Sequence, residues 1–177
     1  MGKYERVLSR RYLRGYDILK TLISVGCSNF KFDRLFEIVD QLIEEGVLTG
    51  EVIAQTGYTD YKIKNYEHFE FISNDEMNKF QNDSDLIICH AGTGTVVGSI
   101  KKGKKVIVFP RLKKFDEHES DNQLELAEQF ASEGYVLTAN DKESLIEAIK
   151  TAETFIPKKF VSNKDNFVNL IKSLLPV

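Results

Sequence analysis

The sequence has 177 residues and three prolines, and 42% of its residues are hydrophobic and 29% charged. This length and composition are typical of one globular domain with a buried core, and they argue against extended disorder. The formal net charge of −3 excludes the global basic excess of many nucleic-acid-binding proteins, so we expect no nucleic acid among the partners.

The chain divides into three predicted parts. Residues 1–16 are a basic extension, residues 17–155 are one α/β domain, and residues 156–177 contain an amphipathic helix predicted at residues 163–174. The basic extension has two interpretations: a solvated chain end, or a helix that docks on a membrane surface or on a partner. Because the chain shows neither an apolar signal segment nor a run of about 20 apolar residues, we expect a cytoplasmic protein.

Short apolar runs alternate with segments of helical periodicity along the chain. The runs predict strands at residues 18–25, 51–55, 68–72, 85–89, 105–109 and 135–137. The periodic segments predict helices at residues 33–45, 74–82, 95–102, 122–133 and 141–152, the second of them capped by Asn74 or Asp75. Nearly continuous apolar strands that alternate with helices are typical of a doubly wound, mostly parallel α/β sheet. We therefore predict a single Rossmann-like lobe.

The cysteines and histidines indicate neither a disulfide nor a metal site. Cys27 and Cys89 each lie beside an apolar run, and we interpret both as small core residues of a reduced protein. The three histidines, His68, His90 and His118, are scattered, and no pair of cysteines or histidines has the spacing of zinc ligands. We expect no metal and no required cofactor.

Two glycine-containing loops follow predicted strands, at residues 26–30 and 90–95. The second reads HAGTGT, in which two glycines permit a tight turn and two threonines add hydroxyl donors: Gly92, Gly94, Thr93 and Thr95. Because a helix begins at the end of this loop, its unpaired amides and its dipole suit a diphosphate, and a plain tight turn is the alternative. The loop matches neither a Walker motif nor a GxGxxG dinucleotide motif, which disfavours kinases, GTPases and dehydrogenases.

The second loop opens a longer segment, HAGTGTVVGSIKKGKKVIVFPRLKKFDEHESDNQLELAEQFASEGYVL. This segment resembles the C-terminal, UDP-sugar-binding half of family 28 glycosyltransferases, the family of MurG. The first loop and its surroundings, SVGCSNFKFDRL, resemble the N-terminal signature of the short, separately encoded members. These members include the PssE and EpsF exopolysaccharide and capsule proteins and the soluble catalytic subunit of the dolichol-linked N-acetylglucosaminyltransferase.

The resemblance implies a GT-B glycosyltransferase that is divided between its lobes. Residues 17–155 would be the nucleotide-sugar-binding lobe, with a UDP-sugar as donor substrate, and a membrane-anchored subunit would supply the acceptor lobe. The implied reaction is an inverting hexosyl transfer, without an obligatory metal, to a lipid-linked sugar acceptor in exopolysaccharide or capsule biosynthesis at the inner face of the membrane. The alternative is a noncatalytic subunit that binds the nucleotide-sugar or stabilises its partner.

The resemblance also implies roles for individual residues. The diphosphate and sugar would face Gly26, Ser28, Gly92, Thr93, Gly94 and Thr95. Asn122 and Gln123 align with a polar pair near the donor sugar, although they can also simply begin a helix. Candidates for the general base, by chemical type, are His90, Glu117 and His118. Longer relatives hold the ribose with a glutamate where this chain has Gly98 or Ser99.

The loop at residues 111–121 carries several cations. Arg111, Lys113 and Lys114 are candidates for contacts with phosphate or with the partner. A solvated basic loop is the alternative interpretation.

Overall fold

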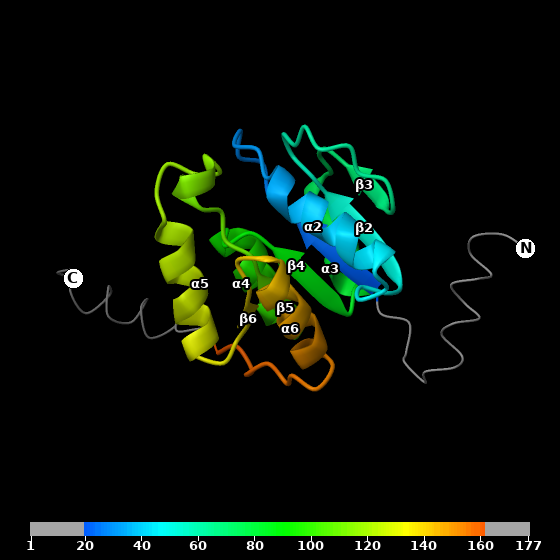
Figure 1. The fold of residues 1–177 in the computed structure, drawn as a ribbon. Helices are drawn as coiled ribbons and strands as arrows, with labels where there is room; N and C mark the ends of the chain where they lie inside the picture. The colour runs from blue at the N-terminus through cyan, green and yellow to red at the C-terminus, as the bar shows by residue number, and fades with distance from the viewer. Residues whose placement is uncertain (1–19, 162–177) are drawn as a thin grey trace, which may run out of the picture.

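The computed structural model describes residues 20–161, which form one parallel sheet with helices on both faces (Figure 1). The strands are β1 (Lys20–Ser24), β2 (Glu51–Gln55), β3 (Glu67–Phe69), β4 (Leu86–Cys89), β5 (Lys105–Val108) and β6 (Leu137–Thr138). Their order in the sheet is β3-β2-β1-β4-β5-β6, and every neighbouring pair is parallel. The predicted doubly wound α/β sheet is confirmed.

Residues 20–161 contain five α-helices, of which four connect strands and the last follows β6. They are α2 (Asp33–Glu44), α3 (Asn74–Asp83), α4 (Thr93–Lys101), α5 (Asn122–Ser132) and α6 (Lys142–Ala152). One hydrophobic core lies between the sheet and α2 with α6, and a second lies between the opposite face and α3, α4 and α5. In the view of Figure 1, α2 and α6 lie in front of the sheet.

The strand sequences explain the two cores. Successive side chains of a strand point to opposite faces, so Leu22 and Ile23 of β1 enter different cores. The register pairs Leu22 with Ile87 and Ile23 with Ile88 of β4, so each face presents a row of fully buried aliphatic side chains. Burial on both faces is the reason that the centres of these strands are apolar.

Several predicted boundaries and caps are wrong in detail. Helix α4 begins at Thr93, two residues before the predicted start, so Thr93 and Gly94 belong to its first turn. The cap of α3 is Ser73, which forms a capping box with Glu76, and not Asn74 or Asp75. Cys89 is buried as predicted, whereas Cys27 is exposed.

Two predicted segments lie outside the described residues. These are the basic extension at residues 1–16 and the amphipathic helix at residues 163–174. The division of the chain at residues 17 and 155 therefore stays a prediction.

The strand order brings the two glycine loops together. The chain runs from β1 outward to β2 and β3, and then crosses back to place β4 on the other side of β1. In parallel sheets, ligands bind at such a reversal, outside the carboxyl ends of the strands. The loop after β1 and the loop after β4 are therefore neighbours at the position where a ligand is expected.

Candidate functional site

The two glycine loops meet at the imidazole ring of His90. Gly26 has a φ of +72°, and a Cβ atom built on it would lie 2.8 Å from His90 Cε1. A Cβ atom on Gly92 would lie 2.1 Å from His90 Nε2. Both loops therefore need glycine because the histidine ring occupies the space in which a side chain would begin.

His90 is held as a neutral ring. Its Nδ1 atom lies 3.3 Å from the carbonyl oxygen of Ser24, which can only accept, so Nδ1 carries the proton. Burial lowers the pKa of His90 to about 4, and the nearby Arg111 guanidinium acts in the same direction. Around neutral pH the ring is therefore uncharged, and a group with this pKa is a weak general base.

The N-terminus of α4 is the main polar feature beside this ring. Within residues 20–161, no side chain caps it; Gly92 is the N-cap residue, and the first-turn amides are those of Thr93, Gly94 and Thr95. Thr93 and Gly94 are exposed, and a Cβ atom on Gly94 would meet no described atom within 4 Å. The amides and the helix dipole together form a site that suits an anion.

Ser28 contributes to the shape of the first loop. Its hydroxyl accepts a hydrogen bond from the amide of Phe30 at 3.4 Å, so it forms a local turn. Ser28 is thus engaged in a turn of the same loop that contains Gly26.

Gln55 is a residue of this site that the sequence analysis missed. It ends β2, is 2% exposed, and forms hydrogen bonds with both the amide and the carbonyl group of Gly26. The only signal in the sequence is a polar residue that directly follows the apolar run at residues 52–54. Such a signal does not distinguish a buried amide from the first residue of a turn.

Arg111 supports the first loop from the other side. Its Nη1 atom donates to the carbonyl oxygens of Phe30 and Lys31 at 2.7 and 2.9 Å, and Nη2 donates to that of Val25 at 3.2 Å. Burial lowers the pKa of Arg111 to about 10, so the guanidinium keeps its charge at neutral pH. The side chain is 1% exposed, which contradicts both the phosphate contact and the solvated loop predicted for Arg111. Lys113 and Lys114, in contrast, are exposed.

Glu117 forms a bidentate ion pair with Arg34. The Nε and Nη2 atoms of Arg34 lie 2.8 and 2.7 Å from the two carboxylate oxygens, and the amide of Leu112 donates to the same group at 3.0 Å. Because both oxygens are engaged and the side chain is nearly buried, this geometry favours a structural role over the predicted role of general base.

The remaining predicted residues lie around the same edge of the sheet. His118 packs beside the Phe30 ring, with 5.7 Å between the centroids. Asn122 and Gln123 begin α5; Asn122 is exposed, and Gln123 Oε1 accepts from the amide of Arg111 at 3.1 Å. Ser99 is buried and its hydroxyl donates to the carbonyl oxygen of Thr95 within α4.

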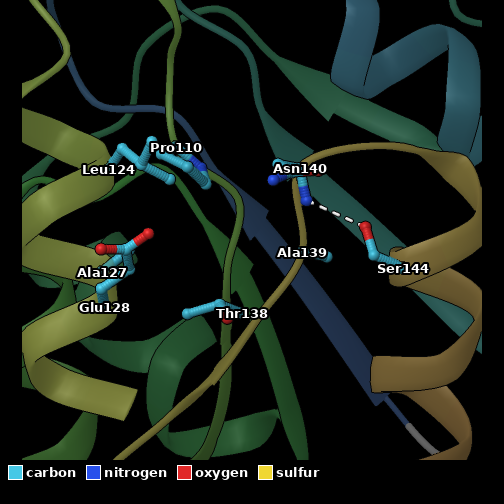
Figure 2. Close-up of a pocket in the computed structure, with 8 residues that line it drawn as sticks. All are labelled: Pro110, Leu124, Ala127, Glu128, Thr138, Ala139, Asn140 and Ser144. Carbon is cyan, nitrogen blue, oxygen red and sulfur yellow. Dashed lines mark hydrogen bonds between the residues drawn. The ribbon is translucent and has the colours of Figure 1, made fainter. Parts of the chain in front are cut away.

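Two cavities border this edge. The larger, of about 460 Å³, lies between the first loop and the loop after β5, and Phe30, Arg34 and Glu117 contribute to its wall. Figure 2 shows the smaller, of about 170 Å³, between α5 and the start of α6, where the amide of Asn140 donates to Ser144 Oγ at 3.0 Å. Neither cavity is lined by the predicted diphosphate residues, of which Thr93 and Gly94 are exposed and the other four are half-buried.

Two further features of the described part of the chain bear on function. Across residues 20–161, no group of three or more histidine, cysteine, aspartate or glutamate side chains is arranged to hold a metal ion. Over the same range, none of the helices is both long enough and apolar enough to cross a bilayer.

Comparison with known proteins extends over nearly the whole chain. The sequence model of the family described as the glycosyltransferase family 28 C-terminal domain matches residues 21–175. The chain is 29% identical over 175 residues to the UDP-N-acetylglucosamine transferase subunit ALG13 of Candida glabrata, covering 96% of this chain and 81% of that protein. The resemblance predicted from the two loop motifs is confirmed.

Solved structures show the same fold. The NMR solution structure of ALG13 matches with a TM-score of 0.55 at 21% identity, covering 87% of this chain and 94% of that one. The crystal structure of Acinetobacter baumannii MurG matches with a TM-score of 0.55 at 19% identity, covering 94% of this chain and 53% of that one. This chain therefore corresponds to about half of a MurG molecule, which confirms the predicted single lobe.

Proposed function

We propose that this chain, which belongs to the glycosyltransferase family 28 C-terminal domain family, is the donor-binding subunit of a two-subunit, UDP-sugar-dependent glycosyltransferase. The observation that carries the proposal is the N-terminus of α4, whose amides no side chain of residues 20–161 caps. This N-terminus follows β4, at the point where the strand order reverses around β1. The first loop, with Gly26 and Ser28, forms the opposite wall, and Asn122 and Gln123 lie where α5 begins.

N-acetylglucosamine is the sugar that we propose for the donor. The support is the name of the Candida glabrata relative, a UDP-N-acetylglucosamine transferase subunit. A lipid-linked acceptor, held by a membrane-anchored acceptor-lobe subunit, completes the proposed enzyme. Under this proposal, the chain is located at the inner face of the membrane through that partner. An exopolysaccharide or capsule context stays a prediction.

The proposed reaction is a single displacement at the anomeric carbon. The acceptor hydroxyl oxygen forms the new bond to this carbon, and UDP leaves with the electron pair of the broken C–O bond. The amides of Thr93, Gly94 and Thr95 and the dipole of α4 stabilise the charge on the leaving diphosphate without a metal ion.

The acceptor proton passes to a general base, which we place in the acceptor lobe. Two of the three candidates in this chain are poorly suited. The pKa of His90 is lowered to about 4, and both carboxylate oxygens of Glu117 are engaged by Arg34. His118, beside Phe30, is the remaining candidate within the described residues.

Isothermal titration calorimetry tests the donor site. UDP and UDP-N-acetylglucosamine are expected to bind the purified chain and to raise its melting temperature, whereas UDP-glucose and UDP-galactose bind more weakly. A chain that binds no uridine nucleotide would contradict the proposal. Equal binding of all three sugars would contradict the choice of N-acetylglucosamine alone.

The poor fit of His90 and Glu117 to base catalysis also favours a second candidate, a noncatalytic nucleotide-sugar-binding subunit. Co-expression with the acceptor-lobe subunit separates the two functions. A catalytic donor lobe predicts that a Gly94→Asp substitution abolishes sugar transfer by the complex. A noncatalytic subunit predicts that transfer continues while UDP binding to this chain is lost.

A further inference from the structure

We infer that Gln55 is a positioning residue of the donor site: its buried side-chain amide holds the backbone of Gly26 in the conformation that a diphosphate requires. The inference rests on the proposed function, because it assumes that the loop after β1 faces the diphosphate. Gln55 itself lies on β2, one strand away from this loop.

The side chain of Gln55 uses its full hydrogen-bonding capacity. Its Oε1 atom accepts from the amide of Gly26 at 3.0 Å and from the hydroxyl of Ser24 at 3.2 Å. Its Nε2 atom donates to the carbonyl oxygens of Gly26 and Glu70 at 2.8 and 3.0 Å. Two lone pairs and two N–H groups are thus all engaged by atoms of three residues.

These partners also decide which way the amide faces. The carbonyl oxygens of Gly26 and Glu70 can only accept, and the amide of Gly26 can only donate. A rotation of the side-chain amide by half a turn would place Oε1 against two carbonyl oxygens. The side chain therefore has one favourable orientation, and in it Gln55 bonds both polar groups of Gly26.

Gly26 needs this support because glycine by itself does not favour a single backbone conformation. Its φ of +72° is one of several conformations open to glycine, and a loop residue without a side chain loses much freedom when it is ordered. Two neighbours restrict it further. The ring of His90 packs against its Cα atom, and a Cβ atom on Gly57 would lie 3.0 Å from its carbonyl oxygen.

Gln55 is 2% exposed, so it acts on the ligand through Gly26 and not by direct contact. Without its amide, Gly26 loses the hydrogen bonds to both of its polar backbone groups, and part of the binding free energy is spent on ordering it. We expect weaker binding of donor and diphosphate alike, by about tenfold. In the two-subunit enzyme this loss appears in KM for the nucleotide-sugar and leaves kcat nearly unchanged.

The test compares Gln55→Met with Gln81→Met. Methionine has similar length and volume but cannot form these hydrogen bonds. Gln81 is also buried, at 4% exposed, but it lies in α3, where it bonds Lys102 and faces Gly98 of α4, and it forms no hydrogen bond with residues 26–30 or 90–95. The readouts are the Kd for UDP by calorimetry, hydrogen exchange at the Gly26 amide, and the melting temperature.

Gln55→Met is expected to weaken UDP binding by about tenfold and to accelerate exchange at Gly26, whereas Gln81→Met leaves both unchanged. Wild-type affinity in Gln55→Met, or equal losses of affinity in the two variants, would overturn the inference. If Gln55→Met does not fold, Ser24→Ala replaces it, since this substitution removes only the hydroxyl that donates to Gln55 Oε1. Ser24→Ala is expected to weaken UDP binding by about twofold. Wild-type affinity in Ser24→Ala would then overturn the inference.

Failure of the proposed function gives a different result. In that case the wild-type chain binds no UDP, and exchange at the Gly26 amide alone decides the role of Gln55. Faster exchange in Gln55→Met than in Gln81→Met supports the positioning role, and equal exchange refutes it.

Discussion

The ion pair between Arg34 and Glu117 allows a decisive test of whether Glu117 acts in folding or in catalysis. Replacement of Glu117 by glutamine keeps the size of the side chain and removes its charge. The Glu117 side chain is 6% exposed and that of Arg34 is 17% exposed, so the substitution leaves a guanidinium largely excluded from water without its anion. One oxygen that accepts from Arg34 or from Leu112 also becomes an NH₂ group that cannot accept.

The expected cost follows from this geometry. Breaking a buried ion pair by removing one partner costs about 3 to 5 kcal/mol. Arg34 keeps its bonds to the carbonyl oxygens of Asn140 and Pro110, at 2.6 and 3.2 Å, and its contact with the Phe109 ring, so the lower limit applies. A loss of about 3 kcal/mol corresponds to a decrease in melting temperature of roughly 6 to 12 °C for a chain of this size.

Urea unfolding followed by circular dichroism measures this loss. Glu119→Gln is the matched control, because Glu119 is exposed in the same loop and its substitution is expected to change stability by less than about 0.5 kcal/mol. A loss below about 1 kcal/mol in Glu117→Gln would refute the structural role. If that variant also abolished turnover of the two-subunit enzyme, Glu117 would be the general base predicted from the sequence.

Three other predictions concern the two loops. Gly94→Asp is expected to abolish the rise in melting temperature caused by UDP, because it adds a carboxylate at the proposed diphosphate site. Gly94→Ala is the control, since a Cβ atom there meets no described atom within 4 Å, and a retained rise in Gly94→Asp would contradict the proposed site. Gly92→Ala is expected to destabilise the fold by about 1 to 3 kcal/mol in urea unfolding, because its Cβ atom would lie 2.1 Å from His90 Nε2. The same substitution in a His90→Ala variant is the control, and an equal loss of stability there would show that the ring is not the cause. The pKa of His90 is lowered from 6.5 to about 4 by burial, so the unfolded chain binds a proton at His90 more readily than the folded chain does. The free energy of unfolding therefore shows no loss from His90 above pH 6.5 and decreases by up to about 3 kcal/mol as the pH falls toward 4. Urea unfolding at pH 7 and pH 4.5 should show this loss in the wild type and a smaller one in His90→Gln, and identical pH dependence in the two proteins would refute it.

Local pattern was sufficient for most of the secondary structure. The apolar runs at β1, β2, β4 and β5 and the periodicity of α2 identify these elements within a few residues of their observed bounds. Boundaries differ where local signals are weak. Thr93 and Gly94 have low helix propensity, which suggests a loop, yet they form the first turn of α4.

The two loops could also be recognised from the sequence, because a glycine between a buried strand and a helix is typical of a tight turn or of a close approach to a ligand. The sequence did not show why each glycine is needed. Gly26 and Gly92 are required by the ring of His90, which contacts Gly26 only because β1 and β4 are neighbours in the sheet. The pattern of one loop contains no information about the other.

By itself, the sequence determined the fold class and the family and predicted the position of an anion site, since these depend on periodicity and on short motifs. Only the tertiary structure decided which polar residues support that site. Arg34 and Glu117 are 83 positions apart, and Gln55 and Gly26 are 29 apart. A charge or an amide is buried only when its partner is also in place, and the partners here lie on different helices, strands and loops. Burial of Arg111, Glu117 and Gln55 is therefore a property of the assembled sheet, which no local pattern contains.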